Sequence, residues 1–94
     1  MILDNRLFFS ATQRNRACIG DVLSKIIRKG SILEIGSGSG EHGVVFQKRF
    51  PEIIWQTSDP KLVHRKSISS WIKYEKLNKK MPNPIMLDLS LIHI

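Results

Sequence analysis

The first periodic block of the chain predicts an amphipathic helix over residues 10–28. Apolar side chains recur there at intervals of three and four residues, which is the spacing of one helix face. They are Ile19, Val22, Leu23, Ile26 and Ile27. Ser10 followed by Gln13 has the spacing of a capping box, and Gly30 is typical of a residue just beyond a helix end. Cys18 lies in the same pattern, so we expect a small buried side chain rather than a nucleophile.

The remaining blocks alternate between short apolar runs and longer mixed segments. The apolar runs over 31–35, 53–58 and 85–87 predict strands, the first of them buried on both faces of a parallel sheet. The segments over 41–49 and 61–76 predict helices. The resulting order of α, β, α, β, α, β is typical of an open α/β fold with parallel strands and right-handed crossovers.

Length and composition limit the class of protein. The chain has 94 residues, which is enough for one domain or less, and 41% of them are hydrophobic, as in a globular protein. Cys18 is the single cysteine, so no internal disulfide can form. We find no signal peptide and no apolar run of transmembrane length, so we expect a cytoplasmic protein with no membrane contact.

The charge balance is basic, with a net charge of +7 and a pI of about 10.0. Basic residues gather at 14–16 and again over 61–80. We interpret the second cluster as a solvated helix face with Trp71 turned toward the core. A nucleic-acid partner, with Trp71 and Tyr74 stacking on bases, is the less favoured alternative.

A glycine-rich loop between the first predicted strand and the second predicted helix is the main candidate for a ligand site. It reads Gly36, Ser37, Gly38, Ser39 and Gly40. Glycine lacks a Cβ and tolerates a positive φ, so a ligand can approach bare backbone there. Glu34 precedes the loop and Glu41 follows it. Ligands of open α/β sheets bind beyond the carboxyl ends of the strands, where Asp59 and Asp88 also lie.

Two cofactor classes fit this loop. Residues 38–43 match the dinucleotide pattern G-x-G-x-x-G, and Asp59 is spaced to bind a ribose hydroxyl. A pyrophosphate at the helix start would face Glu41, however, and two anions in a partly buried site repel each other. S-adenosylmethionine has a sulfonium, an amino group and no phosphate, so an acid-flanked loop favours it. Asp59 would bind its ribose, and Asp88 would accept from its adenine amine. No Gly-Lys-Ser/Thr follows the loop, which excludes a Walker phosphate loop.

Residues 34–40 resemble the first motif of class I methyltransferases, E/D-x-G-x-G-x-G. Four blocks of the chain resemble more specifically the methyltransferase-like family named domain of unknown function 938. These blocks are residues 9–16, 33–42, 50–60, and 67–71 together with 84–88. The chain departs from the family pattern where Ala11 replaces a proline, Gln13 a glutamate and Thr57 a proline.

The resemblance implies a Rossmann-like domain that binds S-adenosylmethionine. The implied cofactor contacts are Glu34, Gly36, Ser37, Gly38, Gly40, Asp59 and Asp88. Arg14 and Asn15 would reach over the pocket to hold a carboxylate of the cofactor or substrate. His42 is a candidate general base, although a polar residue in a first helical turn is commonly there for solubility alone. The sequence identifies no methyl acceptor and predicts no metal site.

Class I methyltransferases order their strands 3-2-1-4-5-7-6, and this chain supplies strands one to three. We therefore expect an N-terminal fragment, with a helical region over 1–30 and a βαβαβ cofactor-binding half over 31–89, its parallel strands in the order 3-2-1 with helices on both faces. Residues 90–94 are expected to be a foreign tail. The function predicted is the cofactor-binding half of a methyltransferase, inactive alone. The alternatives are an NAD(P)-type half-domain and a non-catalytic basic binding module.

Overall fold

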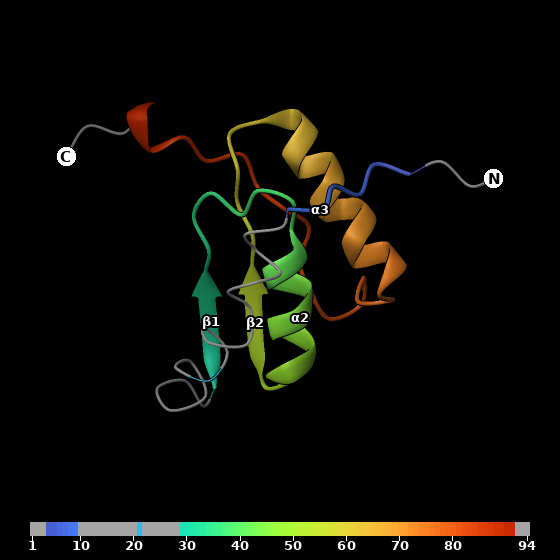
Figure 1. The fold of residues 1–94 in the computed structure, drawn as a ribbon. Helices are drawn as coiled ribbons and strands as arrows, with labels where there is room; N and C mark the ends of the chain where they lie inside the picture. The colour runs from blue at the N-terminus through green and yellow to red at the C-terminus, as the bar shows by residue number, and fades with distance from the viewer. Residues whose placement is uncertain (1–3, 10–20, 22–28, 92–94) are drawn as a thin grey trace.

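A computed structural model describes residues 4–9, 21 and 29–91 of the chain, and shows a small α/β unit (Figure 1). Its elements in chain order are β1 (Gly30–Leu33), α2 (Glu41–Arg49), β2 (Ile53–Gln56), α3 (Leu62–Tyr74) and the short 3₁₀ helix η1 (Leu89–Leu91). The two strands are parallel and pair from Gly30 with Ile53 to Leu33 with Gln56. The predicted α/β class, the parallel pairing and the bounds of α2 are confirmed.

The predicted third strand over 85–87 is reduced to a single parallel bridge between Ile85 and Ser58. The reason lies just beyond this bridge, where a longer parallel strand would pair with the Asp59 carbonyl and the Lys61 N–H. The Lys61 N–H instead donates to the Asp59 carboxylate at 2.9 Å, and the Asp59 carbonyl accepts from Arg65 at 3.0 Å. Before the bridge, the buried amide of Gln47 takes the same edge of β2 by bonding to the backbone of Ile53 and Trp55.

The core lies between α2, β2 and α3. β1 contacts β2, α2 packs on β2, and α3 packs on α2. The buried cluster consists of Val44, Phe46, Trp55, Ile68, Ile72 and Met81. Close packing needs a small residue on α2 at Gly43, because a Cβ there would lie 3.0 Å from side chains of Thr57 and Met81.

The expectation that β1 is buried on both faces is wrong for the described residues. Alternate side chains of a strand point to opposite faces, and only the face of Trp55 lies under α2. On the opposite face, Leu33 is 51% and Ile54 48% exposed. Between residues 29 and 91 no helix covers this second face, so the predicted 3-2-1 sheet with helices on both sides is not present there.

Several predictions concern residues outside the described part of the chain. The helix over 10–28 is described only at Asp21, which is helical. Arg14, Asn15 and Cys18 lie outside the described residues. Within the described residues, no helix is long and apolar enough to cross a membrane.

Candidate functional site

The glycine loop turns the chain from β1 into α2 through three residues with positive φ. The φ angles are 63° at Gly36, 62° at Gly38 and 94° at Gly40. The three glycines meet different surroundings. A Cβ at Gly40 would lie 2.9 Å from the Ile68 backbone, so this glycine lets α3 approach the loop. A Cβ at Gly36 would meet nothing within 4 Å, so its bare backbone faces open space.

Two serines bind the loop to the chain beyond β2. The N–H of Ser37 donates to the Ser58 carbonyl at 2.8 Å, and the N–H of Ser58 donates back to the Ser37 hydroxyl at 3.0 Å. The hydroxyl of Ser58 donates to the Glu34 carbonyl at 2.6 Å. These bonds hold the ends of the two strands together and fix the first half of the loop.

Asp59 braces the loop from the opposite side. Its Oδ2 accepts from the Gly38 N–H at 2.9 Å, and its Oδ1 accepts from the Lys61 N–H at 2.9 Å. The Nδ1 of His64 lies 3.1 Å from the same Oδ1. Burial opposes ionisation of this carboxyl, but the N–H groups and His64 outweigh it, so the pKa of Asp59 is lowered. The bond to the Lys61 N–H ties Asp59 to the residue just before α3, and no side chain caps the first turn of that helix.

Glu34 presents a half-buried carboxylate at the end of β1. The indole N–H of Trp55 donates to its Oε1 at 3.1 Å. Burial raises the pKa of Glu34, and this effect outweighs the Trp55 and Ser37 hydrogen bonds and the charge of His42, which lower it. Because burial disfavours the charged form of this carboxylate, a cation placed beside it would stabilise that charged form.

Glu41 is 3% exposed at the first turn of α2. Its Oε1 accepts from the Phe9 N–H at 2.8 Å. Its Oε2 is buried and has no hydrogen-bond donor among the described residues. The helix start, where an anionic ligand would bind, therefore already holds a carboxylate of the chain itself.

Residues 4–9 form a strap that runs along α3 to the loop, as Figure 1 shows in blue. The N–H of Leu7 donates to the Ser67 hydroxyl at 2.8 Å, and the indole of Trp71 donates to the Leu7 carbonyl at 2.9 Å. The Ser67 hydroxyl in turn donates to the Ser39 carbonyl. The strap ends at Phe9, whose ring lies where a Cβ of Gly38 would approach within 3.2 Å. Phe9 thus covers the Gly38 part of the loop and leaves Gly36 open.

The structure unites some of the predicted site residues and not others. Glu34, Ser37, Gly38 and Asp59 are joined through the hydrogen bonds described above. Asp88 instead accepts from the N–H and hydroxyl of Ser90, in the short η1 helix that directly follows it. No group of three or more potential metal ligands lies together among the described residues.

Sequence reasoning missed three residues that complete the site. Trp55 and His64 contact the carboxylates of Glu34 and Asp59, and Phe9 covers the loop. The sequence motif Trp-Gln-Thr-Ser-Asp over 55–59 could have indicated Trp55. Its Trp55, Ser58 and Asp59 form hydrogen bonds to the glycine loop or to Glu34 just before it.

Because the pKa of Glu34 is raised in the folded chain, we expect the free energy of unfolding to depend on pH through this group. Between the unfolded and folded pKa values of this group, the folded chain binds more protons, so its contribution to stability falls as pH rises. We expect Glu34→Gln to raise the melting temperature at neutral pH, since glutamine keeps an acceptor for the Trp55 indole. Thermal unfolding monitored across pH measures this. The surface change Glu52→Gln is the control, and an equal effect of both substitutions would contradict the assignment.

The geometry thus defines a class: a parallel α/β unit with a carboxylate-braced glycine loop at the carboxyl ends of its strands. Comparison with known families places the chain further. Residues 6–93 match the DUF938 family, described as "Protein of unknown function", and the chain belongs to that family.

Proposed function

We propose that the glycine loop binds S-adenosylmethionine and that this chain contributes the cofactor-binding part of a methyltransferase. One observation carries the proposal: both positions of the loop that would accept an anion hold carboxylates of the chain itself. Asp59 takes the N–H of Gly38, and Glu41 lies at the start of α2. A phosphate would have to displace or face these groups, whereas a phosphate-free cation is attracted by them.

The residues present fit such a ligand. Glu34 would accept a hydrogen bond from its amino group, and the open backbone at Gly36 would allow close approach. Asp59 would use its remaining acceptor capacity for the ribose, and Asp88 would accept from the adenine amine. Ser37, Gly38 and Gly40 shape the loop. When bound, this cofactor supplies a methyl group activated by a positively charged sulfur.

The proposal extends to the fold of the whole protein. We propose that β1, β2 and the segment around Ile85 belong to the 3-2-1 half of a class I methyltransferase sheet. The parallel bridge at Ile85, on the opposite edge of β2 from β1, supports this order. The methyl acceptor and the residues acting on it are not part of the proposal.

Calorimetric titration of the chain tests the cofactor directly. We expect binding of S-adenosylmethionine and none of NAD at the same concentrations. Glu34→Gln should weaken binding by about tenfold, because a hydrogen bond to a charged group is lost. Affinity should rise with pH through the acid range, since a bound cation lowers the pKa of Glu34 and releases its proton.

Glu52→Gln serves again as the matched control, and we expect it to leave the affinity unchanged. Tight binding of NAD without binding of S-adenosylmethionine would overturn the proposal. An affinity that Glu34→Gln leaves unchanged would remove Glu34 from the site.

A further inference from the structure

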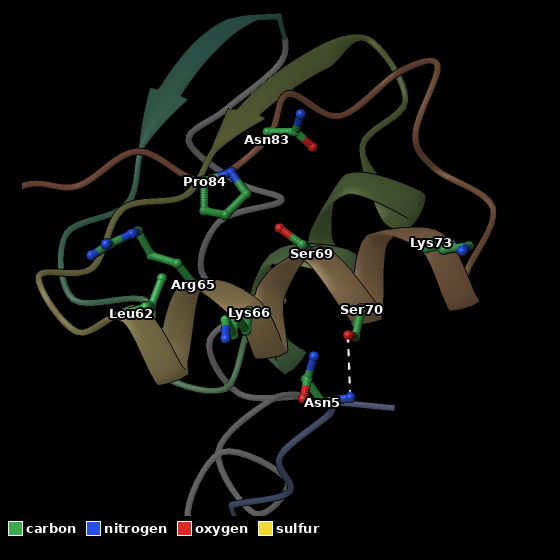
Figure 2. Close-up of a pocket in the computed structure, with 9 residues that line it drawn as sticks. All are labelled: Asn5, Leu62, Arg65, Lys66, Ser69, Ser70, Lys73, Asn83 and Pro84. Carbon is green, nitrogen blue, oxygen red and sulfur yellow. Dashed lines mark hydrogen bonds between the residues drawn. The ribbon is translucent and has the colours of Figure 1, made fainter. Parts of the chain in front are cut away.

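The solvent face of α3 carries a shallow groove that the proposed cofactor site does not use (Figure 2). Its volume is about 460 Å³. The opposite face of α3, with Ser67, Ile68 and Ile72, is buried. The groove lies over the exposed turns of the helix, with Asn83 and Pro84 on one side and Asn5 on the other, as Figure 2 shows. We call it the α3 groove.

The charges in the α3 groove are of one sign. Arg65, Lys66 and Lys73 line it, and none of its lining residues is acidic. The guanidinium of Arg65 is fixed by donating to the carbonyls of Asp59 and Pro60. Within the described part of the chain, neither Lys66 nor Lys73 forms an ion pair. Unpaired cations on one helix face attract an anionic partner.

The spacing of these cations suits a repeating anion. Lys66 and Lys73 are seven residues apart, so their backbone positions lie about 10 Å apart along α3. Two separate phosphates of a nucleic-acid strand can therefore be neutralised at once. Between the two lysines, the hydroxyl of Ser69 is exposed on the same face, and the amide of Asn83 lies opposite. Hydroxyl and amide groups are common donors to phosphate oxygens.

An aromatic cluster at the C-terminal end of α3 adds a surface for bases. Tyr74 directly follows Lys73 and is 59% exposed. The guanidinium carbon of Arg6 lies 3.6 Å from the Tyr74 ring centroid, and Phe8 beside them is 60% exposed. Stacking of unpaired bases on such rings is typical of single-stranded nucleic-acid binding. The groove offers an acidic peptide few apolar anchors, since only Leu62 and Pro84 are apolar among its lining residues.

We propose that the α3 groove binds the phosphate backbone of single-stranded RNA, with Tyr74 stacking on an adjacent base. Lys66 and Lys73 neutralise two phosphates, and Ser69 and Asn83 donate to phosphate oxygens. The proposal does not depend on the cofactor, because the groove and the glycine loop share no residue.

Fluorescence anisotropy with a labelled single-stranded RNA of mixed sequence tests this proposal on the full chain. The double variant Lys66→Gln/Lys73→Gln should weaken binding by about tenfold and make the slope of log affinity against log salt less negative by about 1.4. Tyr74→Ala should weaken binding at least about fivefold. The matched control Lys79→Gln/Lys80→Gln removes the same charge from exposed positions outside the groove, and should change the affinity less than about twofold.

Melting temperatures of all variants verify that they fold. An equal loss of RNA affinity in both double variants would contradict binding at the α3 groove, because net charge alone would then explain the binding. Binding of a polyglutamate chain as tight as that of RNA would overturn a nucleic-acid partner in favour of an acidic protein. Preference for DNA of the same sequence would overturn RNA as the ligand.

Discussion

Replacing Gly40 with alanine is expected to lower the free energy of unfolding by about 3 kcal/mol. Two effects combine. The residue has a φ of 94°, a conformation that costs any residue with a Cβ. The new Cβ would also lie 2.9 Å from the Cα and Cγ1 of Ile68, so α3 must move away from the loop. Urea unfolding followed by tryptophan fluorescence measures this loss.

Gly36→Ala is the matched control for Gly40→Ala. Gly36 also has a positive φ, of 63°, but a Cβ there meets no atom within 4 Å. Only the backbone strain remains, and we expect a loss of about 1 kcal/mol. Equal losses at the two glycines would show that α3 does not pack on Gly40 as described. A Gly36 variant that is stable yet binds the proposed cofactor poorly would support ligand approach at that backbone.

Asp59→Asn is expected to lower the free energy of unfolding by about 2 kcal/mol at neutral pH. Asparagine keeps the shape, but its NH₂ group faces one of the two N–H donors, of Gly38 or Lys61. The loss depends on pH. Because the pKa of Asp59 is lowered, its contribution is present above the unfolded pKa and disappears as pH falls through the folded value. Denaturant unfolding at neutral and acid pH measures both effects.

The control for Asp59→Asn is Asp88→Asn, since Asp88 also accepts from backbone and hydroxyl groups but only within its own exposed turn. We expect a much smaller change there than at Asp59. A destabilisation by Asp59→Asn that persists unchanged at acid pH would contradict the role of the Asp59 charge. It would leave packing as the cause.

The local elements follow from local sequence signals. α2 lies directly after the glycine loop, over the segment 41–49 where the sequence predicts a helix. The pairing of β1 with β2 follows from two apolar runs joined by a helix. Asp59 could be placed near the loop because the carboxyl ends of parallel strands meet at one edge of a sheet.

The features that were missed depend on contacts between distant residues. The third strand is short because the backbone groups that would continue its pairing, the Lys61 N–H and the Asp59 carbonyl, bond to the side chains of Asp59 and Arg65. No periodicity predicts such side-chain bonds to the backbone. The strap over residues 4–9 is likewise held by side chains more than 30 positions away, at Glu41 and Ser67. The prediction that β1 is buried on both faces was wrong, because a continuous apolar run does not reveal how many helices cover the strand.

The charges of the site could be predicted from the sequence, because Glu34 and Asp59 lie at the ends of predicted strands. The hydrogen bonds inside the site could not be predicted, because the Asp59 carboxylate accepts from the Gly38 N–H instead of facing open space. That bond strengthens the argument against phosphate beyond what the charges of Glu34 and Glu41 alone provide. The same bond gives Asp59 a structural role, so Asp59 would have to bind a ligand while it also holds the loop.

The most direct test of the cofactor assignment is an amide NMR titration of the ¹⁵N-labelled chain with S-adenosylhomocysteine, and separately with NAD. This method detects weak binding and locates it. We expect saturable shifts with S-adenosylhomocysteine at residues 34–38 and at Asp59, with none at Ser69 on the outer face of α3. We expect no shifts in the loop with NAD. Loop shifts with NAD alone, or no loop shifts with S-adenosylhomocysteine, would contradict the cofactor assignment.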